Sequence, residues 1–154
     1  MIDRFTEKAK DAIGLAADAA ESLGHHYVGT EHLLIGLIQE GTGVAARVLD
    51  ECGVKEDKVV ELISELISPN NGVGTAERST YTPGARKVIE NSYREAVRFK
   101  APLIGTEHIL IAMIKDASIR GLLYFEKDIL ARNLELLNVQ GFEYTGYTAR
   151  IADR

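Results

Sequence analysis

The chain carries the segment GTEHLLI at residues 29–35 and, 76 positions later, GTEHILI at residues 105–111. The same offset aligns the first copy with the second without a gap over positions 6–38. Self-similarity at a fixed spacing is the signature of a repeated structural unit. The sequence therefore predicts two copies of one unit, whose common register is lost after Ser118.

Both copies have the pattern of helices. Apolar residues recur at helical spacing between Thr6 and Gly24, and Thr82-Pro83 combines a capping hydroxyl with a proline suited to the first helical position. Each GTEH segment opens a second, largely aliphatic helix. Helices are thus expected near residues 6–23, 30–39, 43–51, 55–67, 83–99, 106–115, 118–124 and 127–137. The predicted fold class is all-α, with two tandem four-helix repeats (about eight helices) forming one globular domain.

The repeat divides the chain into four parts. The first repeat is expected at residues 1–67 and the second at 81–137. Residues 68–80 between them are rich in Pro, Asn, Gly and Ser, which is typical of a linker. Residues 138–154 have no counterpart in the first repeat, and three interpretations stay open: a linker to a downstream region, an extra segment packed on the bundle, or a purification remnant.

Composition excludes several classes of protein. The 154 residues are 45% apolar and carry a net charge of -5, the wrong sign for a binder of nucleic-acid backbones. No apolar run approaches the roughly 18 residues that span a bilayer, and the first residues lack the pattern of a signal peptide. Cys52 is the single cysteine, so no intrachain disulfide can form. We expect a cytoplasmic protein with no membrane and no nucleic-acid partner.

The doubled unit resembles the N-terminal (Clp repeat) domain of ClpC-type AAA+ unfoldases of the Clp family. Besides the two GTEH segments, the resemblance rests on FTEKA at residues 5–9, GTGVAARVL at 41–49 and YTP at 81–83, and it extends over about residues 2–137. It implies two four-helix units related by a pseudo-two-fold axis. It also implies a domain above an ATP-driven ring that receives adaptors and substrates for unfolding and, with a partner protease, for degradation.

The chain has no Gly-x-x-x-x-Gly-Lys-Ser/Thr phosphate loop. We therefore expect no cofactor here, with ATP bound in a downstream ATPase region. The favoured interpretation is a recognition domain cut from a longer unfoldase; the alternative is a free-standing accessory protein that docks to a Clp ring and regulates its assembly. The partners that the resemblance implies are MecA-like or McsB-like adaptors, protein substrates and, through the ring, the Clp protease.

The resemblance also implies a ligand. In ClpC-type domains of some Gram-positive bacteria, the paired GTEH glutamates bind phosphoarginine, a degradation mark. A carboxylate can accept forked guanidinium N–H groups, and a phosphate suits the free N–H groups and positive dipole of a helix N-terminus. Two sites would raise avidity for a multiply marked substrate. The candidate phosphoarginine-binding residues are Glu31, Glu107, Thr6, Thr30, Thr82 and Thr106.

A purely structural role for the two glutamates stays open. A carboxylate in the first turn of a helix stabilises it by about 0.3–1 kcal/mol through the dipole alone. The second copy also departs from the first, because Lys100-Ala101-Pro102-Leu103 replaces Gly24-His25-His26-Tyr27 and the Gly-x-Gly turn of residues 41–43 is missing. We therefore expect Glu31 to bind more tightly than Glu107.

Catalysis and metal binding find little support in the sequence. Glu31 and His32 are adjacent on a helix and diverge by about 100°, unlike the i, i+4 histidines of a zinc helix, so His25, His26 and His32 are not expected to bind a metal. His32 and His108 are expected to be partly buried and hydrogen-bonded at matching positions.

A small hydrolase acting on a phosphorylated guanidinium is a remote alternative, because the duplicate acids are separated and lack a positioned base. We expect no catalytic residues and no enzyme activity.

Overall fold

The computed structural model describes residues 4–66 and 80–115, and in them the chain is all-helical apart from two isolated backbone bridges. The six helices are α1 (Glu7–Ser22), α2 (Thr30–Glu40), α3 (Val44–Glu51), α4 (Glu56–Leu66), α5 (Pro83–Arg98) and α6 (Thr106–Lys115). These six predicted helices are confirmed, with boundaries shifted by one residue or less. The helices predicted at 118–124 and 127–137, the segment 138–154 and nearly all of the linker lie outside the described residues. None of the described helices has the length and apolar character that crossing a membrane requires.

Equivalent threonines begin the first helix of each repeat. The Thr6 hydroxyl accepts a hydrogen bond from the N–H of Ala9 (3.1 Å), and the Thr82 hydroxyl accepts one from Ala85 (3.0 Å). Each hydroxyl thereby satisfies a backbone donor that the helix itself cannot pair. Pro83 follows Thr82 where its missing N–H is harmless. The predicted helix caps are confirmed.

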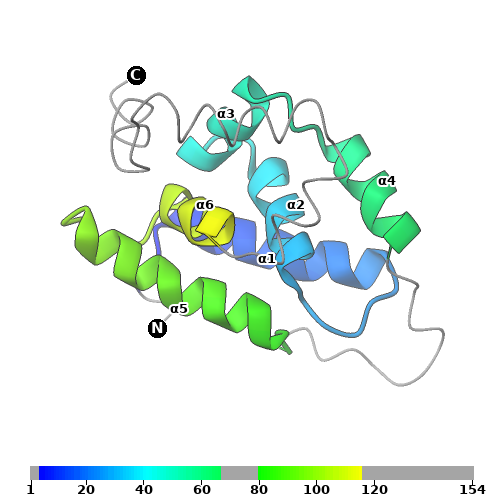
Figure 1. The fold of residues 1–154 in the computed structure, drawn as a ribbon, viewed down its shortest axis with the longest axis horizontal. Helices are drawn as coiled ribbons and strands as arrows, with labels where there is room; N and C mark the ends of the chain where they lie inside the picture. Colours follow the sequence, from blue (N-terminus) through cyan, green and yellow to red (C-terminus); the bar gives the residue numbers. More distant parts are fainter. Residues whose placement is uncertain (1–3, 67–79, 116–154) are drawn as a thin grey trace.

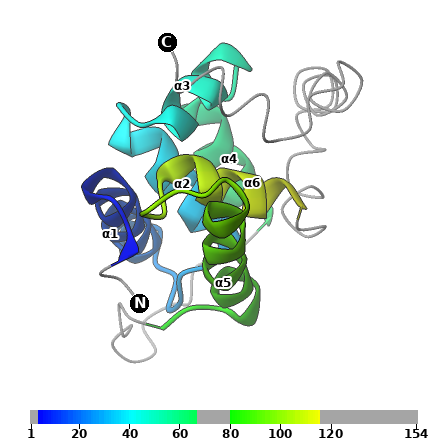
Figure 2. The same cartoon turned by 90° about the vertical axis from the view of Figure 1, so that its left-hand side faces the viewer.

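Helices α2 and α6 lie at the centre of the molecule. Figures 1 and 2 show α1 packed along α2 and α5 packed along α6, with α3 above the central pair. Every residue of α6 before Lys115 is buried except Glu107, which is half-buried. The largest side chains of the core come mostly from these two helices: Leu33, Leu34, Ile35 and Leu37 from α2, and Ile109 and Met113 from α6.

Two short parallel bridges tie the repeats together. Each joins the segment before the first helix of one repeat to the segment before the second helix of the other; the paired residues are Phe5 with Ile104 and Val28 with Tyr81. Two backbone hydrogen bonds of 2.7–3.0 Å close each bridge. The bridges are related by the repeat offset, as a pseudo-two-fold axis requires.

The turn after α1 recurs after α5 with a different sequence. Gly24 has a φ of 76°, and Lys100 at the equivalent position has a φ of 58°. The backbone hydrogen bonds match, since the N–H of each residue donates to the carbonyl three residues back at 3.0 Å. The replacement of Gly24 by lysine therefore leaves the path of the chain into α6 unchanged. The counterpart of the Gly-x-Gly turn lies outside the described residues.

Candidate functional site

Each GTEH segment places a carboxylate at the start of a buried helix. Glu31 lies in the first turn of α2 and Glu107 in the first turn of α6. Their side chains are 14% and 19% exposed, so both are largely enclosed but open to solvent. We call Glu31 with the starts of α2 and α5 the first acidic site, and Glu107 with the starts of α6 and α1 the second acidic site.

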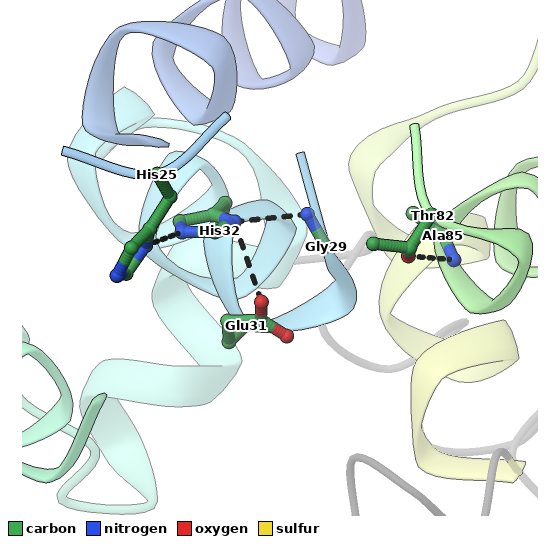
Figure 3. Close-up of polar contacts among 6 residues, drawn as sticks. All are labelled: His25, Gly29, Glu31, His32, Thr82 and Ala85. Atoms are coloured by element: carbon green, nitrogen blue, oxygen red, sulfur yellow. Dashed lines mark hydrogen bonds and ion pairs between the residues drawn. The ribbon is translucent and has the colours of Figure 1, made fainter. Parts of the chain in front are cut away.

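Helix starts from both repeats meet at each site. A Cβ atom at Gly84 in α5 would lie 3.9 Å from the methyl group of Thr30 in α2, and the N–H of Thr82 donates to the carbonyl of Val28 at 3.0 Å. Figure 3 shows Thr82 and Ala85 beside Gly29 and Glu31. The candidate residues thus pair across the repeats, Thr82 with Glu31 and, through the other bridge, Thr6 with Glu107. The sequence pattern did not indicate this pairing.

Free backbone donors lie at the two helix starts of the first acidic site. Within the described residues, the N–H groups of Thr30, Glu31 and Gly84 donate to no acceptor. The first-turn amides of a helix have no intrahelical partner, and the helix dipole adds positive potential. The first acidic site therefore combines one carboxylate with two converging helix starts that favour an anion.

The glycine of each GTEH segment makes room for the carboxylate. An added Cβ atom at Gly29 would overlap the carboxylate of Glu31, and one at Gly105 would overlap that of Glu107. Gly29 has a φ of -99°, an ordinary extended conformation, so the backbone itself does not require glycine there. The glycine instead lets the acidic side chain fold back over the helix start.

Hydrogen bonds fix the protonation of His32. The N–H of Gly29 donates to Nδ1 of His32 at 2.9 Å, so Nδ1 carries no proton. The ring proton is therefore on Nε2, which lies 2.7 Å from Nδ1 of His25 and donates to it. Burial, and secondarily the neighbouring His25, lower the pKa of His32 to about 4. His32 is neutral at pH 7.

The neutral His32 leaves Glu31 without a cationic partner. Oε1 of Glu31 lies 3.5 Å from Nδ1 of His32, but both atoms are hydrogen-bond acceptors there and no proton lies between them. No Lys or Arg side chain in the described residues forms an ion pair with Glu31. Glu31 is an acceptor at a helix start, available to a cation from outside the chain.

The second site repeats the helix cap with different surroundings. The N–H of Gly105 donates to Nδ1 of His108 at 2.8 Å, and Oε1 of Glu107 lies 3.8 Å from the same nitrogen. Burial lowers the pKa of His108, while the carboxylates of Glu107 and Glu95 raise it. Ala101 stands where the first repeat has His25. His108 is therefore less firmly held neutral than His32.

The threonine hydroxyls largely serve the fold. The buried Thr106 hydroxyl accepts the N–H of Ala45 at 3.2 Å, at the start of α3, while those of Thr6 and Thr82 cap their own helices. Thr30 is also buried. What these threonines present to a ligand is thus mainly the backbone N–H groups around them. Within residues 4–66 and 80–115, no three His, Cys, Asp or Glu side chains gather into a possible metal site.

The two sites also differ at the opposing helix start. The start of α5 at the first site has Pro83-Gly84, whereas the start of α1 at the second site has Glu7-Lys8. The Lys8 ammonium donates to the Thr42 carbonyl at 3.4 Å. The opposing helix start therefore begins with two uncharged residues at the first site, and with one acidic and one basic residue at the second site.

Comparison with known protein families decides the assignment. The model of the Clp repeat (R) N-terminal domain matches residues 4–125. The chain belongs to this family. The predicted resemblance is confirmed.

Similar curated proteins are Clp-type chaperones and ATP-binding subunits. The chain is 41% identical over 116 residues to the negative regulator of genetic competence ClpC/MecB of Bacillus subtilis, and 43% identical over 117 residues to ClpC of Staphylococcus aureus strain USA300. It is 42% identical over 118 residues to the chaperone protein ClpB of Oceanobacillus iheyensis. Each match covers 75% of this chain but 14% of the relative, so the chain spans about a seventh of their length.

Solved Clp N-domains share the fold. The N-terminal domain of ClpD from Arabidopsis thaliana superposes with a TM-score of 0.68 at 23% identity, covering 90% of this chain and 96% of that one. The ClpV N-domain solved in complex with a VipB peptide gives a TM-score of 0.67 at 17% identity, covering 99% and 89%. At these identities the likeness establishes the all-α fold of a Clp N-domain.

Proposed function

We propose that this chain is the N-terminal receptor domain of a ClpC-like, ATP-dependent unfoldase of regulated proteolysis, acting in the cytoplasm. It binds adaptors and substrates and carries out no chemistry itself. Family membership and 41–43% identity to the N-terminal regions of ClpC and ClpB proteins support this role. The motor and its ATP would belong to a region outside this chain.

We further propose phosphoarginine-marked protein as the ligand of the two acidic sites. The Glu31 carboxylate accepts guanidinium N–H groups, and the free N–H groups of Thr30, Glu31 and Gly84 donate to the phosphate. The observation that carries the proposal is the absence, within the described residues, of any cation paired with Glu31, although the carboxylate lies at two converging helix starts. The purely structural role of a first-turn glutamate does not explain this convergence.

The two sites are expected to differ in strength. Burial lowers the pKa of both histidines, but the carboxylates of Glu107 and Glu95 oppose this shift at His108. As the pH falls, His108 would therefore take up a proton before His32 does, and it would then compete with the guanidinium group for Glu107. We propose that the first acidic site is the tighter one.

Calorimetric titration with phosphoarginine tests this function. We expect the wild-type chain to bind with about two sites. Glu31→Gln keeps the size of the side chain and removes its charge, so it should weaken the first site about 10- to 100-fold, as expected for one lost charge-assisted hydrogen bond. Glu107→Gln should weaken only the second site.

Matched controls separate recognition of the mark from general charge effects. Glu61→Gln removes an exposed carboxylate on α4 and should leave binding unchanged. Free arginine and phosphoserine, each offering half of the ligand, should bind far more weakly than phosphoarginine. No binding at millimolar phosphoarginine would refute the receptor role, and equal losses in the two glutamine variants would refute the difference in strength.

Adaptor docking is the second function we propose for the domain. A solved neighbour of the same fold, the ClpV N-domain, is described in complex with a VipB peptide. We propose MecA-like or McsB-like adaptors as partners here, with the Clp protease reached only through the ATPase ring. Co-elution of this chain with such adaptors in gel filtration is the test. An ATPase module in the complete coding sequence would exclude the alternative of a free-standing accessory protein.

A further inference from the structure

We propose that His25 is a positioning residue for the first acidic site: it accepts Nε2–H of His32 and so helps the N–H of Gly29 to hold the neutral tautomer that leaves Glu31 unpaired. Its absence from the second repeat then makes the two sites functionally unequal. The inference rests on the proposed function insofar as Glu31 binds a guanidinium group. The state of His32 itself can be measured without any ligand.

Gly29, His32 and His25 form a chain of two hydrogen bonds, in which each group donates to the next. The N–H of Gly29 donates to Nδ1 of His32 (2.9 Å), and Nε2–H of His32 donates to Nδ1 of His25 (2.7 Å; Figure 3). His32 is 0% exposed and His25 is 3% exposed, so water does not substitute for either partner. Because Nδ1 of His25 acts as the acceptor, the proton of His25 lies on its Nε2.

The backbone holds His25 in place independently of His32. Its N–H donates to the carbonyl of Ala20 at 2.9 Å, in the turn that Gly24 closes with a φ of 76°. The two rings lie with centroids 4.9 Å apart and planes tilted by 58°. In the described part of the chain, Glu31 is the one charged group within ion-pair distance of either ring.

Loss of the acceptor at position 25 would change the charge of the site. A buried Nε2–H without a partner is costly, and without His25 the pKa of His32 rises, so the ring takes up a proton more readily. The protonated ring carries an N–H at Nδ1, which can donate to Glu31, whose Oε1 is 3.5 Å away. The carboxylate would then be occupied from within the protein and would bind an external cation less well.

The second repeat is the natural comparison, because its turn has the same backbone and lacks the histidine. Ala101 occupies the place of His25, and Nε2 of His108 has no hydrogen-bond partner within the described residues. The Phe99 ring lies against His108 instead, with centroids 5.4 Å apart. Glu107 and Glu95, the second on α5, are the carboxylates that face this imidazole.

A reciprocal exchange tests the inference. The variants are His25→Ala, His25→Asn, whose Oδ1 can replace Nδ1 as the acceptor, and Ala101→His. His26→Ala is the matched control, since it removes an adjacent histidine that is not part of the hydrogen-bond chain from Gly29 through His32 to His25. The readouts are the ¹⁵N spectra of the imidazoles between pH 4.5 and 7.5, and the phosphoarginine affinity of each site at pH 6 and 7.5.

We expect wild-type His32 to show the Nε2–H tautomer and to remain mainly neutral across this range. In His25→Ala, His32 should take up a proton at higher pH, and the first site should lose about three- to tenfold in affinity, as for one neutral hydrogen bond, with the greater loss at pH 6. His25→Asn should restore both properties. Ala101→His should give Nε2–H of His108 an acceptor, lower the pKa of His108 further and strengthen the second site.

Two results would overturn the inference. One is a His32 whose tautomer and titration are the same in wild type and His25→Ala; the other is a changed His32 with an unchanged first-site affinity. Should His25→Ala fail to fold, His25→Asn and Ala101→His still decide through the same spectra. A wild-type chain that binds no phosphoarginine refutes the proposed function. The spectra still test the inference in that case: a His32 that stays neutral supports it, and a His32 that titrates freely overturns it.

Discussion

At the first acidic site, a backbone N–H determines which ring nitrogen of His32 carries the proton. In a common capping arrangement, a glutamate or glutamine at the third helical position reaches back to the N-cap amide. His32 takes that role here: the N–H of Gly29 occupies its Nδ1, and burial keeps the ring neutral. Within the described residues, the adjacent glutamate is consequently left without an ion-pair partner, although a histidine lies 3.5 Å away.

Gly29→Ala tests the placement of the carboxylate without altering its chemistry. The added methyl group would occupy the space of the Glu31 carboxylate and displace it from the helix start. We expect phosphoarginine affinity at the first site to fall roughly tenfold, while the free energy of unfolding falls by at most about 1 kcal/mol, as for an alanine at an N-cap. Calorimetry and urea denaturation measure the two effects.

Gly14→Ala is the matched control for that substitution. Gly14 is exposed in the middle of α1 and a Cβ atom there meets nothing, so the variant should gain about 0.5–1 kcal/mol in stability and bind normally. Unchanged first-site affinity in Gly29→Ala would show that the position of the Glu31 carboxylate does not matter for binding.

Part of the site could be predicted at the scale of single residues. The doubled GTEH segment identified Glu31 and Glu107, and it placed His32 and His108 at matching, hydrogen-bonded positions. The role of His25 could not be predicted, since it depends on the turn after α1 folding His25 back onto α2. The repeat did carry a usable signal: position 25 is histidine in the first copy and alanine in the second.

The helices themselves follow from local chemistry. The hydroxyls of Thr6 and Thr82, the proline after Thr82 and the apolar spacing all act within one or two turns of the chain. For this reason the sequence predicted all six described helices with accurate boundaries. It gave no indication that Lys100 would adopt the left-handed conformation of Gly24, because lysine disfavours it.

The strained turn after α5 leads to a stability prediction. Lys100 has a φ of 58°, where a side chain costs about 1–2 kcal/mol relative to the usual backbone conformations. Lys100→Gly relieves this strain but adds flexibility to the unfolded chain, so we expect a net gain of about 0.5–1 kcal/mol in urea denaturation. In the first repeat, Gly24→Ala places a side chain at the equivalent left-handed position and should destabilise the domain. A destabilised Lys100→Gly variant would contradict this account.

For the molecule as a whole, burial of neutral histidines makes stability depend on pH. His32 has a pKa of about 4 in the folded protein against 6.5 as a model value, so the unfolded chain binds the proton more readily. The contribution of neutral His32 to the free energy of unfolding is complete above pH 6.5. It is lost as the pH falls towards 4, by about 3 kcal/mol in total. Burial of His108 acts with the same sign.

Chemical denaturation at pH 7, 5.5 and 4.5 measures this dependence. His32→Asn keeps an acceptor for the N–H of Gly29 and removes the titrating group, so its stability should vary less with pH than that of the wild type. A wild type and a variant with parallel pH profiles would show that His32 does not take part.

The assembly of the two repeats lay beyond the sequence pattern. Periodicity and capping describe each helix separately, whereas the bridges between Phe5 and Ile104 and between Val28 and Tyr81 join segments far apart in the chain. The pseudo-two-fold arrangement was expected from the family resemblance. The resemblance did not indicate that each acidic site takes one helix start from each repeat.

This sharing between repeats sets an order of events during synthesis on the ribosome. The Glu31 carboxylate emerges early, but its opposing helix start at Thr82 emerges some fifty residues later. The Glu107 side chain emerges last and must find the start of α1, made at the beginning of translation. A nascent first repeat therefore lacks the opposing helix start of the first site and the carboxylate of the second, so under the proposed function it would not yet bind a marked protein.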